Sequence, residues 1–377
     1  MKRIILTTGL TVLIVLMAAC NKKGTEDPAK DTGPTVTVPA EDTSDEDGKD
    51  ENEVSVQPTE APTETPEEIL TVEDYFPLLK DTEYAYEGIG NEYASSRVFV
   101  DYLDEGKNRI QTRTNNGGTD TVKVIEIKDG KISVIFQEGE CYYRENFLDH
   151  KAEEPDVLLM EPLVQETRWT LPDGRSRSIT NMDVEIQTPS GTYHALEVTT
   201  EGEDDLIKDY YAEGIGLVKS IFESGETEIT SALSEVIKNS PFTRTVDLYY
   251  PDSEGQLNAG QMVLSFHTND VTRLVLQEAV KESVSQYTGL PLFTTNTKIN
   301  SLYLGEDHIV YIDFSPEFVS EMNAGSLYES LILQAITNTL GSYYGAEEVY
   351  ITVDNKPYES GHILMKEGET FRVNMEK

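Results

Sequence analysis

Residues 121–136, TVKVIEIKDGKISVIF, decide the fold of the first half of the chain. Apolar and polar residues alternate on both sides of Lys128-Asp129-Gly130, and this period of two is typical of half-buried strands. The dipeptide Asp-Gly strongly favours a tight turn between antiparallel strands. The stretch therefore predicts a β-hairpin with strands over 121–127 and 131–136.

Similar alternating segments continue along the chain on both sides of this hairpin, separated by turn residues such as those at 189–191 and 202–204. The pattern predicts further strands at Arg97–Leu103, Met182–Gln187, Tyr193–Thr199, Ile207–Tyr211 and Leu217–Phe222. Residues 71–238 are therefore predicted to form a Tyr-rich antiparallel β domain, a meander with few helices.

Two residues of this domain, Trp169 and Cys141, are candidates for a functional role. Trp169 would stack on sugar rings if it were exposed, but a buried strand anchor is the favoured interpretation. Cys141 would be reactive only if its thiol pKa were lowered, and the acids Glu138, Glu140 and Glu145 nearby have the opposite effect. We expect Cys141 to be a packed, inert residue.

After residue 241, segments with the period of two of a strand alternate with segments that have the helical period of about 3.6 residues. A strand is predicted at Thr245–Tyr250, followed by a helix from Val271 to Tyr287 that Asn269 or Asp270 caps. The expected apolar stripe of this helix consists of Leu274, Val275, Ala279, Val280 and Val284.

Three further strands and one helix follow. Strands at Lys298–Leu304 and Ile309–Phe314 flank a short hairpin loop, and a last strand is expected at Val349–Val353. Between them, Ser326 and Glu329 form a predicted capping box that opens a helix ending near Gly341. Its apolar residues are Leu327, Leu331, Ile332, Ala335, Ile336 and Leu340.

The resulting order, β-α-β-β-α-β, predicts an α+β domain with one twisted sheet and both helices on one face. Such a layer pair leaves the other sheet face and the edge strands available for other proteins. The chain as a whole is therefore predicted to be multidomain.

Residues 243–376 resemble the GerMN domain of spore-formation and germination lipoproteins. The resemblance rests on Leu248–Ser253, Val271–Val284, Ile309–Ser315, Leu333–Leu340 and Val353–Pro357, taken in this order. GerMN domains are similar to ring-building modules of secretion systems, so the resemblance implies interaction rather than catalysis and supplies no catalytic residues. The spore lipoprotein of that name resembles a tandem of two such domains, whereas this chain offers one.

The first twenty residues predict export. Lys2 and Arg3 precede an apolar run over 4–16, and small residues follow at the expected cleavage point, as in a secretory signal. Residues 17–20, Met-Ala-Ala-Cys, resemble the bacterial lipobox, in which the cysteine becomes the first mature residue and carries lipid. We therefore expect lipidation of Cys20 and a location on the outer face of the cell membrane; the alternatives are ordinary secretion and an uncleaved anchor.

Residues 21–70 contain 15 acids, 4 lysines and six prolines, and no aromatic residue. This composition is predicted to form a disordered acidic linker, because it offers too little apolar surface to offset the entropy of ordering. At about 5–6 Å times the square root of its length, such a linker reaches on the order of 40 Å from the membrane.

The charge balance excludes one class of partner. The chain has 377 residues, with 30 Lys and Arg against 69 Asp and Glu, and a net charge of −39. Because phosphate backbones are bound through clustered basic side chains, no nucleic-acid partner is expected. The two cysteines give no disulfide framework in the mature chain, and the five histidines lack the spacing of a metal site, so no metal and no cofactor is predicted.

We find no catalytic motif in the sequence, neither a Gly-x-Ser-x-Gly elbow, nor His-Glu-x-x-His, nor a phosphate or dinucleotide loop. The nearest set is Asp313, Ser315 and His308 around one hairpin, where Asp313 and Ser315 are better explained as partners of local backbone groups. The chain is therefore not expected to be an enzyme.

Two functions remain open. The first is a membrane-anchored binding or assembly module for envelope proteins, with a possible role in sporulation or germination. The second is a peptidoglycan- or carbohydrate-binding lipoprotein, which adjacent tyrosines favour because one residue of each pair on a strand faces outward. These pairs are Tyr142 and Tyr143, Tyr249 and Tyr250, and Tyr343 and Tyr344.

Overall fold

The computed structural model describes residues 70–284, 287 and 290–375. The predicted signal segment, Cys20 and all of the predicted linker except its last residue lie outside the described residues. Residues 66–377 form one compact unit, which contains three β-sheets.

The first sheet contains twelve antiparallel strands and begins after the short 3-10 helix η1 (Val72–Tyr75). Its strands are β1 (Thr82–Ile89), β2 (Ser96–Asp104), β3 (Arg109–Asn115), β4 (Asp120–Lys128), β5 (Lys131–Glu138), β6 (Asp156–Met160), β7 (Arg168–Thr170), β8 (Ser176–Thr188), β9 (Gly191–Glu201), β10 (Leu206–Ala212), β11 (Gly216–Ser224) and β12 (Thr227–Lys238). Neighbours in sequence are neighbours in the sheet except for β6 and β7, which form its two edges, and β1 pairs with β12. The predicted run of antiparallel strands is confirmed, and all seven predicted strands occur; the sequence patterns missed β1, β3, β6, β7 and β12.

The β4–β5 hairpin has the predicted register, with Lys128 opposite Lys131. Asp129 and Gly130 both have positive φ angles, 53° and 67°, as a type I′ turn requires. This turn matches the right-handed twist of the strands, so the local sequence alone fixes the pairing.

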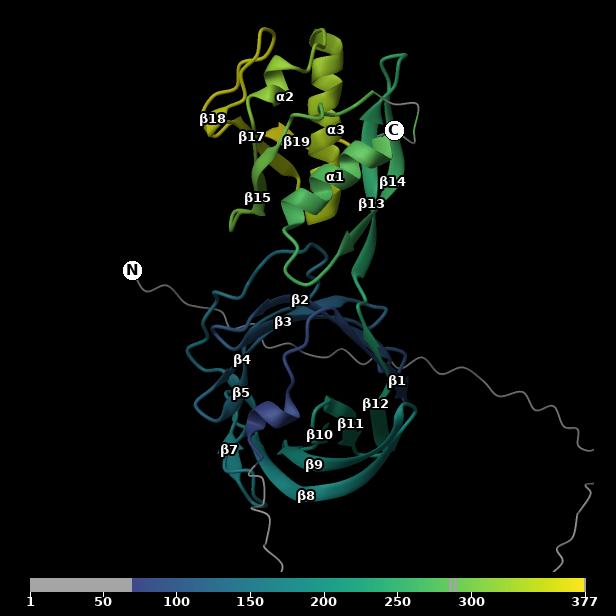
Figure 1. Ribbon diagram of the computed structural model, residues 1–377, viewed down its shortest axis with the longest axis vertical. Helices are drawn as coiled ribbons and strands as arrows, with labels where there is room; N and C mark the ends of the chain where they lie inside the picture. The colour runs from purple at the N-terminus through teal and green to yellow at the C-terminus, as the bar shows by residue number, and fades with distance from the viewer. Residues whose placement is uncertain (1–69, 285–286, 288–289, 376–377) are drawn as a thin grey trace, which may run out of the picture. The chain divides into compact units, whose positions relative to one another are not determined.

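The sheet curls until its two edge strands, β6 and β7, approach each other, and η1 lies inside the curl (Figure 1). Side chains bridge these edges: Trp169 Nε1 donates to the Val157 carbonyl at 2.8 Å, and Arg177 forms an ion pair with Asp156 at 2.9 Å. On the concave side a buried apolar cluster runs from Val72 of η1 to Tyr211 of β10. The prediction that Trp169 is a buried strand anchor is confirmed.

The remaining elements are β13 (Phe242–Pro251), β14 (Leu257–Phe266), α1 (Thr272–Val284), β15 (Ile299–Leu304), β16 (Ile309–Phe314), α2 (Glu317–Ser320), α3 (Ser326–Tyr344), β17 (Glu348–Val353), β18 (Lys356–Pro357) and β19 (Phe371–Arg372). All six predicted elements occur in the predicted order. The single predicted sheet is wrong, because β13 pairs with the unpredicted β14 in a separate two-stranded sheet. The third sheet is formed by β15–β19. In it β16 and β17 run parallel, because α3 connects them.

The start of both long helices differs from the prediction. Asn269 does not cap α1. Its side chain accepts a hydrogen bond from the Leu103 amide at 2.8 Å and donates one to the Leu103 carbonyl at 3.0 Å. Asp270 accepts a hydrogen bond from the His267 amide at 2.8 Å. The prediction of a capping box at the start of α3 is also wrong. The N-cap residue is Gly325, and the buried Glu329 carboxylate accepts a hydrogen bond from the Tyr358 hydroxyl.

Two residues placed on apolar stripes point outward, since Leu274 is 44% and Leu327 is 60% exposed. The buried apolar residues of α1 are instead Leu276, Val280 and Val284. These side chains join residues of β13–β17 and α3 in one core.

Candidate functional site

The predicted residues around the β15–β16 hairpin hold the sheet together. Asp313 is 3% exposed, and its carboxylate accepts hydrogen bonds from Asn300 Nδ2 at 2.8 Å, Thr352 Oγ1 at 2.6 Å and the Asn355 amide at 2.7 Å. These donors come from β15, β17 and the turn after β17. Asp313 therefore ties three strands to one another, and its acceptor sites are used for structure.

The other two members of the set are not brought into a catalytic arrangement. Ser315 Oγ accepts a hydrogen bond from the Lys298 amide at 3.0 Å. His308 lies in the hairpin turn with a φ of 61°, and it lines a surface pocket together with Tyr143 and Tyr344. That pocket includes neither Asp313 nor Ser315. Both residues do accept from backbone amides, as predicted, but these amides lie on other segments of the domain and are not local in sequence.

A row of three tyrosines crosses the open face of this sheet. The register places Tyr303 of β15 opposite Tyr311 of β16, and Tyr311 beside Tyr350 of β17. The rings of Tyr303 and Tyr311 stack at 5.2 Å with an interplanar angle of 7°, and Tyr350 meets Tyr311 edge-on at 5.7 Å. We call Tyr303, Tyr311 and Tyr350 the tyrosine ladder.

The ladder is both fixed and accessible. Tyr303 is 45% exposed, and Tyr311 is held by a hydrogen bond from its hydroxyl to Asp307 at 2.7 Å. On the other face of the same strands, Val310, Ile312, Val349 and Ile351 are buried in the core. An aromatic surface of this kind gains little further order on binding, so it suits a protein partner or a sugar ring.

The adjacent pairs expected to supply exposed tyrosines behave differently. Tyr343 and Tyr344 lie on α3, not on a strand, and both are buried. Tyr142 is 40% exposed, whereas Tyr143, Tyr249 and Tyr250 are half-buried. The sequence signal for the ladder was instead the symmetric placement of Tyr303 and Tyr311 about the hairpin turn.

A buried arginine on the β5–β6 loop joins the twelve-stranded sheet to the C-terminal elements. Arg144 is 1% exposed, and its guanidinium donates to the Asp101 carbonyl at 2.6 Å, the Tyr102 hydroxyl at 2.8 Å and the His267 carbonyl at 3.1 Å, and also to the Asp270 carbonyl. Its backbone amide donates to Tyr343 of α3 at 3.0 Å. The loop thus holds both regions through one side chain.

Alternating charges extend this junction through the interior. Asp101 lies 3.6 Å from Arg144 Nε and 3.0 Å from Arg113, and Asp120 lies 3.7 Å from Arg113 and 2.8 Å from Arg244 of β13. Burial opposes the charge of Arg113, but the carboxylate of Asp101 holds its pKa above the ordinary value. The network pairs each buried charge, which is the condition for retaining charges inside a protein.

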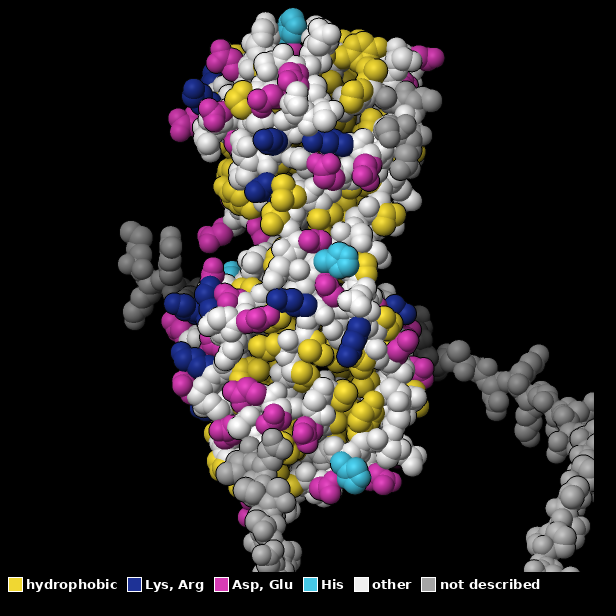
Figure 2. All heavy atoms as spheres, viewed as in Figure 1, with side chains coloured by type: hydrophobic (Ala, Val, Ile, Leu, Met, Phe, Trp, Pro, Cys, Tyr) yellow, Lys and Arg dark blue, Asp and Glu magenta, His cyan; other side chains and the backbone are white. Residues whose placement is uncertain are grey.

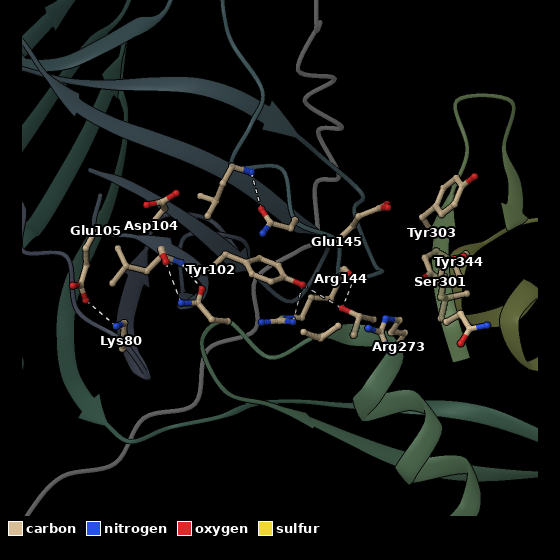
Figure 3. A pocket seen from close by; sticks show the side chains of 18 residues that line it. Lys80, Tyr102, Asp104, Glu105, Arg144, Glu145, Arg273, Ser301, Tyr303 and Tyr344 are labelled. Atoms are coloured by element: carbon tan, nitrogen blue, oxygen red, sulfur yellow. Dashed lines mark hydrogen bonds and ion pairs between the residues drawn. The ribbon is translucent and has the colours of Figure 1, made fainter. Parts of the chain in front are cut away.

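Beside this junction lies an open pocket of about 760 Å³, which Figure 3 shows with acidic and basic side chains around Tyr102 and Arg144. Lys80 and Glu105 form an ion pair of 2.8 Å on its rim. Burial raises the pKa of Glu145 in the pocket to about 7, so this carboxyl titrates near neutral pH. Among the described lining residues no hydroxyl or thiol is paired with a base in the way that nucleophilic catalysis uses.

Cys141 is buried, and burial raises its thiol pKa to about 11 although Arg113 nearby acts in the opposite direction. The thiol is therefore protonated at neutral pH, as predicted for an inert residue. Across residues 70–284, 287 and 290–375, no three His, Cys, Asp or Glu side chains gather as metal ligands would. No helix in this described part of the chain is long and apolar enough to span a membrane.

Basic side chains do not collect into one patch on the face seen in Figure 2. Lys and Arg side chains lie there among Asp and Glu side chains.

Comparison with known proteins identifies the C-terminal segment. The model of the Germane family, described as sporulation and spore germination, matches residues 247–359. These residues run from β13 past β18 and include the tyrosine ladder. No curated protein matches the chain.

Several solved structures are similar to part of the chain. The tandem GerMN domains of the sporulation protein GerM from Bacillus subtilis are 19% identical, cover 31% of this chain and give a TM-score of 0.24. A Clostridium perfringens protein described as a lipoprotein is 20% identical, with 35% of this chain and 87% of that protein covered and a TM-score of 0.24. A Bacteroides fragilis protein described as exported is 14% identical, with 43% and 98% covered and a TM-score of 0.27.

This chain spans 41% of the length of the tandem GerM structure. The family match covers the central part of the segment, 243–376, that carries the sequence resemblance. Residues 247–359 therefore match the Germane family model, and we call the region formed by β13–β19 the Germane domain after this match.

Proposed function

We propose that this protein is a non-catalytic envelope lipoprotein that presents its Germane domain to another envelope protein through the tyrosine ladder. The observation that carries the proposal is the register of β15, β16 and β17, which aligns three aromatic side chains on the open sheet face. The description of the Germane family supports a role in sporulation or germination. Lipid on Cys20 would hold the chain on the outer face of the cell membrane, and residues 21–70 would separate the sheets from the bilayer.

The anchor is tested by fractionating cells that produce the full chain or its Cys20→Ser variant. The wild-type chain is expected in the membrane fraction, with a mass at its mature N-terminus that shows added acyl chains. The variant is expected to leave that fraction. An unmodified, full-length N-terminus recovered from the cytosol would contradict the proposed location.

The partner is tested by co-purification from solubilised membranes. Tyr303→Ala removes an exposed ring whose hydroxyl makes no hydrogen bond with a described residue, so the domain should remain folded. Tyr93→Ala is the matched control, since Tyr93 is 52% exposed and lies outside the ladder. An envelope protein recovered with the wild-type chain and the control, but not with Tyr303→Ala, supports the proposal.

The second candidate function is binding of peptidoglycan or another carbohydrate. It is favoured by the nearly parallel rings of Tyr303 and Tyr311, since aromatic faces of this kind stack on sugar rings. Sedimentation with purified peptidoglycan separates the two functions. Binding that is lost in Tyr303→Ala favours the carbohydrate, and absence of sedimentation together with a co-purified protein favours the assembly module.

A further inference from the structure

A second candidate binding site lies inside the twelve-stranded sheet. The concave face encloses a cavity of about 410 Å³, within the range that holds small ligands. Its walls are mainly apolar and aromatic, and they include Phe76, Tyr84, Val98, Ile110, Leu158 and Tyr211. In Figure 2 hydrophobic side chains gather on the face of the molecule over the region that these strands enclose in Figure 1.

Four charged side chains face this cavity, and two of them are paired with each other. Arg177 donates to Asp156 at 2.9 Å, to the Val157 carbonyl at 2.7 Å and to Thr200 at 2.7 Å. These bonds use the guanidinium to bridge the sheet edges. Arg177 and Asp156 are therefore occupied by the fold.

The third charge, Lys123, has no such partner. It projects from the middle of β4 on the same side as Ile125, which lines the cavity, while Val122 and Val124 pack on the opposite side. Its ammonium group makes no hydrogen bond or ion pair with a residue that the structure describes. Burial lowers its pKa, although the carboxylates of Asp156 and Asp209 act in the opposite direction without contacting it.

The fourth charge, Asp209 of β10, does not neutralise Lys123 by direct contact. Its carboxylate accepts a hydrogen bond from Ser220 at 2.6 Å, and burial raises its pKa. The two groups lie close enough to influence each other, but they form no ion pair. The cavity therefore combines an apolar wall with one unpaired cation.

We propose that this cavity binds a long-chain carboxylate, with its aliphatic tail against the apolar wall and its carboxylate paired with Lys123. An anion at this position would supply the direct ion-pair partner that Lys123 lacks among the described residues, and its tail would bury apolar surface. The cavity size limits the occupant to one slender chain.

This site is independent of the tyrosine ladder, which belongs to the Germane domain. A failure to bind carboxylates would leave the proposed partner of the ladder untouched. Conversely, loss of the partner in Tyr303→Ala would say nothing about the cavity.

The experiment uses the full chain with Cys20→Ser, which removes the predicted lipid and the need for detergent. Three probes of equal chain length are titrated by displacement of a fluorescent fatty acid: tetradecanoate, tetradecyl phosphate and 1-tetradecanol. Lys123→Met keeps the length of the side chain and removes its charge. Lys131→Met on the neighbouring strand is the control, since Lys131 is exposed.

We expect tetradecanoate to bind with one-to-one stoichiometry and to lose about tenfold in affinity in Lys123→Met, with 1-tetradecanol changed by less than about twofold. Lys131→Met should match the parent chain. Tighter binding of tetradecyl phosphate than of the carboxylate would overturn the carboxylate assignment in favour of a phospholipid-derived anion. Absence of binding, or equal carboxylate affinity in the parent and Lys123→Met, would overturn the site.

A second measurement does not depend on ligand. Because Lys123→Met removes a buried cation that has no direct ion pair, the ligand-free variant should unfold at a higher temperature than the parent chain. A lower unfolding temperature would show that Lys123 is paired within the fold, and it would overturn the proposal. Lys123→Arg, which keeps the charge, should retain carboxylate binding.

Discussion

The twelve-stranded sheet and the Germane domain differ in how completely side chains fill their interiors. The curled sheet leaves a cavity of about 410 Å³ with charged side chains facing it, whereas a space between α1, α3 and the strands of the Germane core holds only about 20 Å³ and has an almost wholly apolar lining. The Germane interior is filled by α1, α3 and the strands they cover. The sheet has only η1 and the residues after it to fill its concave face.

This difference indicates where each region can bind. A filled core leaves the Germane domain with its surface alone, and the tyrosine ladder is the ordered aromatic part of that surface. A curled sheet with a cavity can take a ligand inside. The buried ion network around Arg144 couples the two regions, so a change in one has a path to the other.

The largest effect is expected from breaking that coupling. Arg144→Ala removes four hydrogen bonds of the guanidinium and leaves the Asp101 carboxylate with fewer partners, so the free energy of unfolding should fall by about 3–5 kcal/mol. Urea denaturation measures this loss. Arg175→Ala, at an exposed ion pair with Asp173, should cost less than about 1 kcal/mol. Equal losses in both variants would show that the junction is not a coupling element.

Asp313 tests whether the Germane sheet depends on its one buried carboxylate. Asp313→Ala leaves three donors without their acceptor, and we expect a loss of about 2–3 kcal/mol in the free energy of unfolding. Glu306→Ala, in the exposed hairpin turn, should be neutral within about 0.5 kcal/mol. A hydrolytic activity of the parent chain that disappears in Asp313→Asn, with stability retained, would contradict the structural role.

The carboxyl of Glu145, which lies beside the junction of the two regions, should make the stability of the chain depend on pH. Its folded pKa of about 7 lies above the usual value, so the folded chain binds this proton more tightly than the unfolded chain does. Stability from this group is therefore present at low pH and is lost as pH rises toward 7. Glu145→Gln should stabilise the chain by roughly 1 kcal/mol at pH 8, allowing for solvent screening, and by nothing measurable at pH 4. Thermal unfolding at both pH values checks this; an identical gain at pH 4, or Glu153→Gln behaving alike, would contradict it.

The smallest effect on stability is expected at the ladder. Tyr303→Ala should change the free energy of unfolding by less than about 1 kcal/mol, because its ring is exposed and contributes one stacked pair. Its effect should appear in partner recovery instead. A loss of more than about 2 kcal/mol would mean that the ladder is part of the core rather than a binding surface.

Much of the fold follows from local sequence. The hairpin at 121–136 was predictable because alternation and Asp-Gly act over a few residues, and the turn angles confirm both. The predicted helices and most strands of the Germane domain were found for the same reason. What local patterns could not predict is the split into two sheets, since β14 and its pairing with β13 depend on contacts across the domain.

The errors in the candidate site have the same origin. Glu329 has the spacing of a capping residue, but a tertiary contact with Tyr358 decides its position. Adjacent tyrosines drew attention to Tyr343 and Tyr344, yet packing against Tyr143 and Arg144 buries them. The tyrosine ladder could be recognised only once the register of β15, β16 and β17 was known. The role of Lys123 depends on the curl of the sheet, because a strand pattern shows neither the burial of this side chain nor its lack of an ion-pair partner.

The most direct test of the proposed function is site-specific photo-crosslinking in intact cells. A photoreactive residue is placed at position 303 on the ladder, or at position 263 on β14, where Val263 is 62% exposed. The account predicts a crosslink from position 303 to one envelope protein and none to that protein from position 263. Equal crosslinking from both positions, or none from position 303, would contradict it.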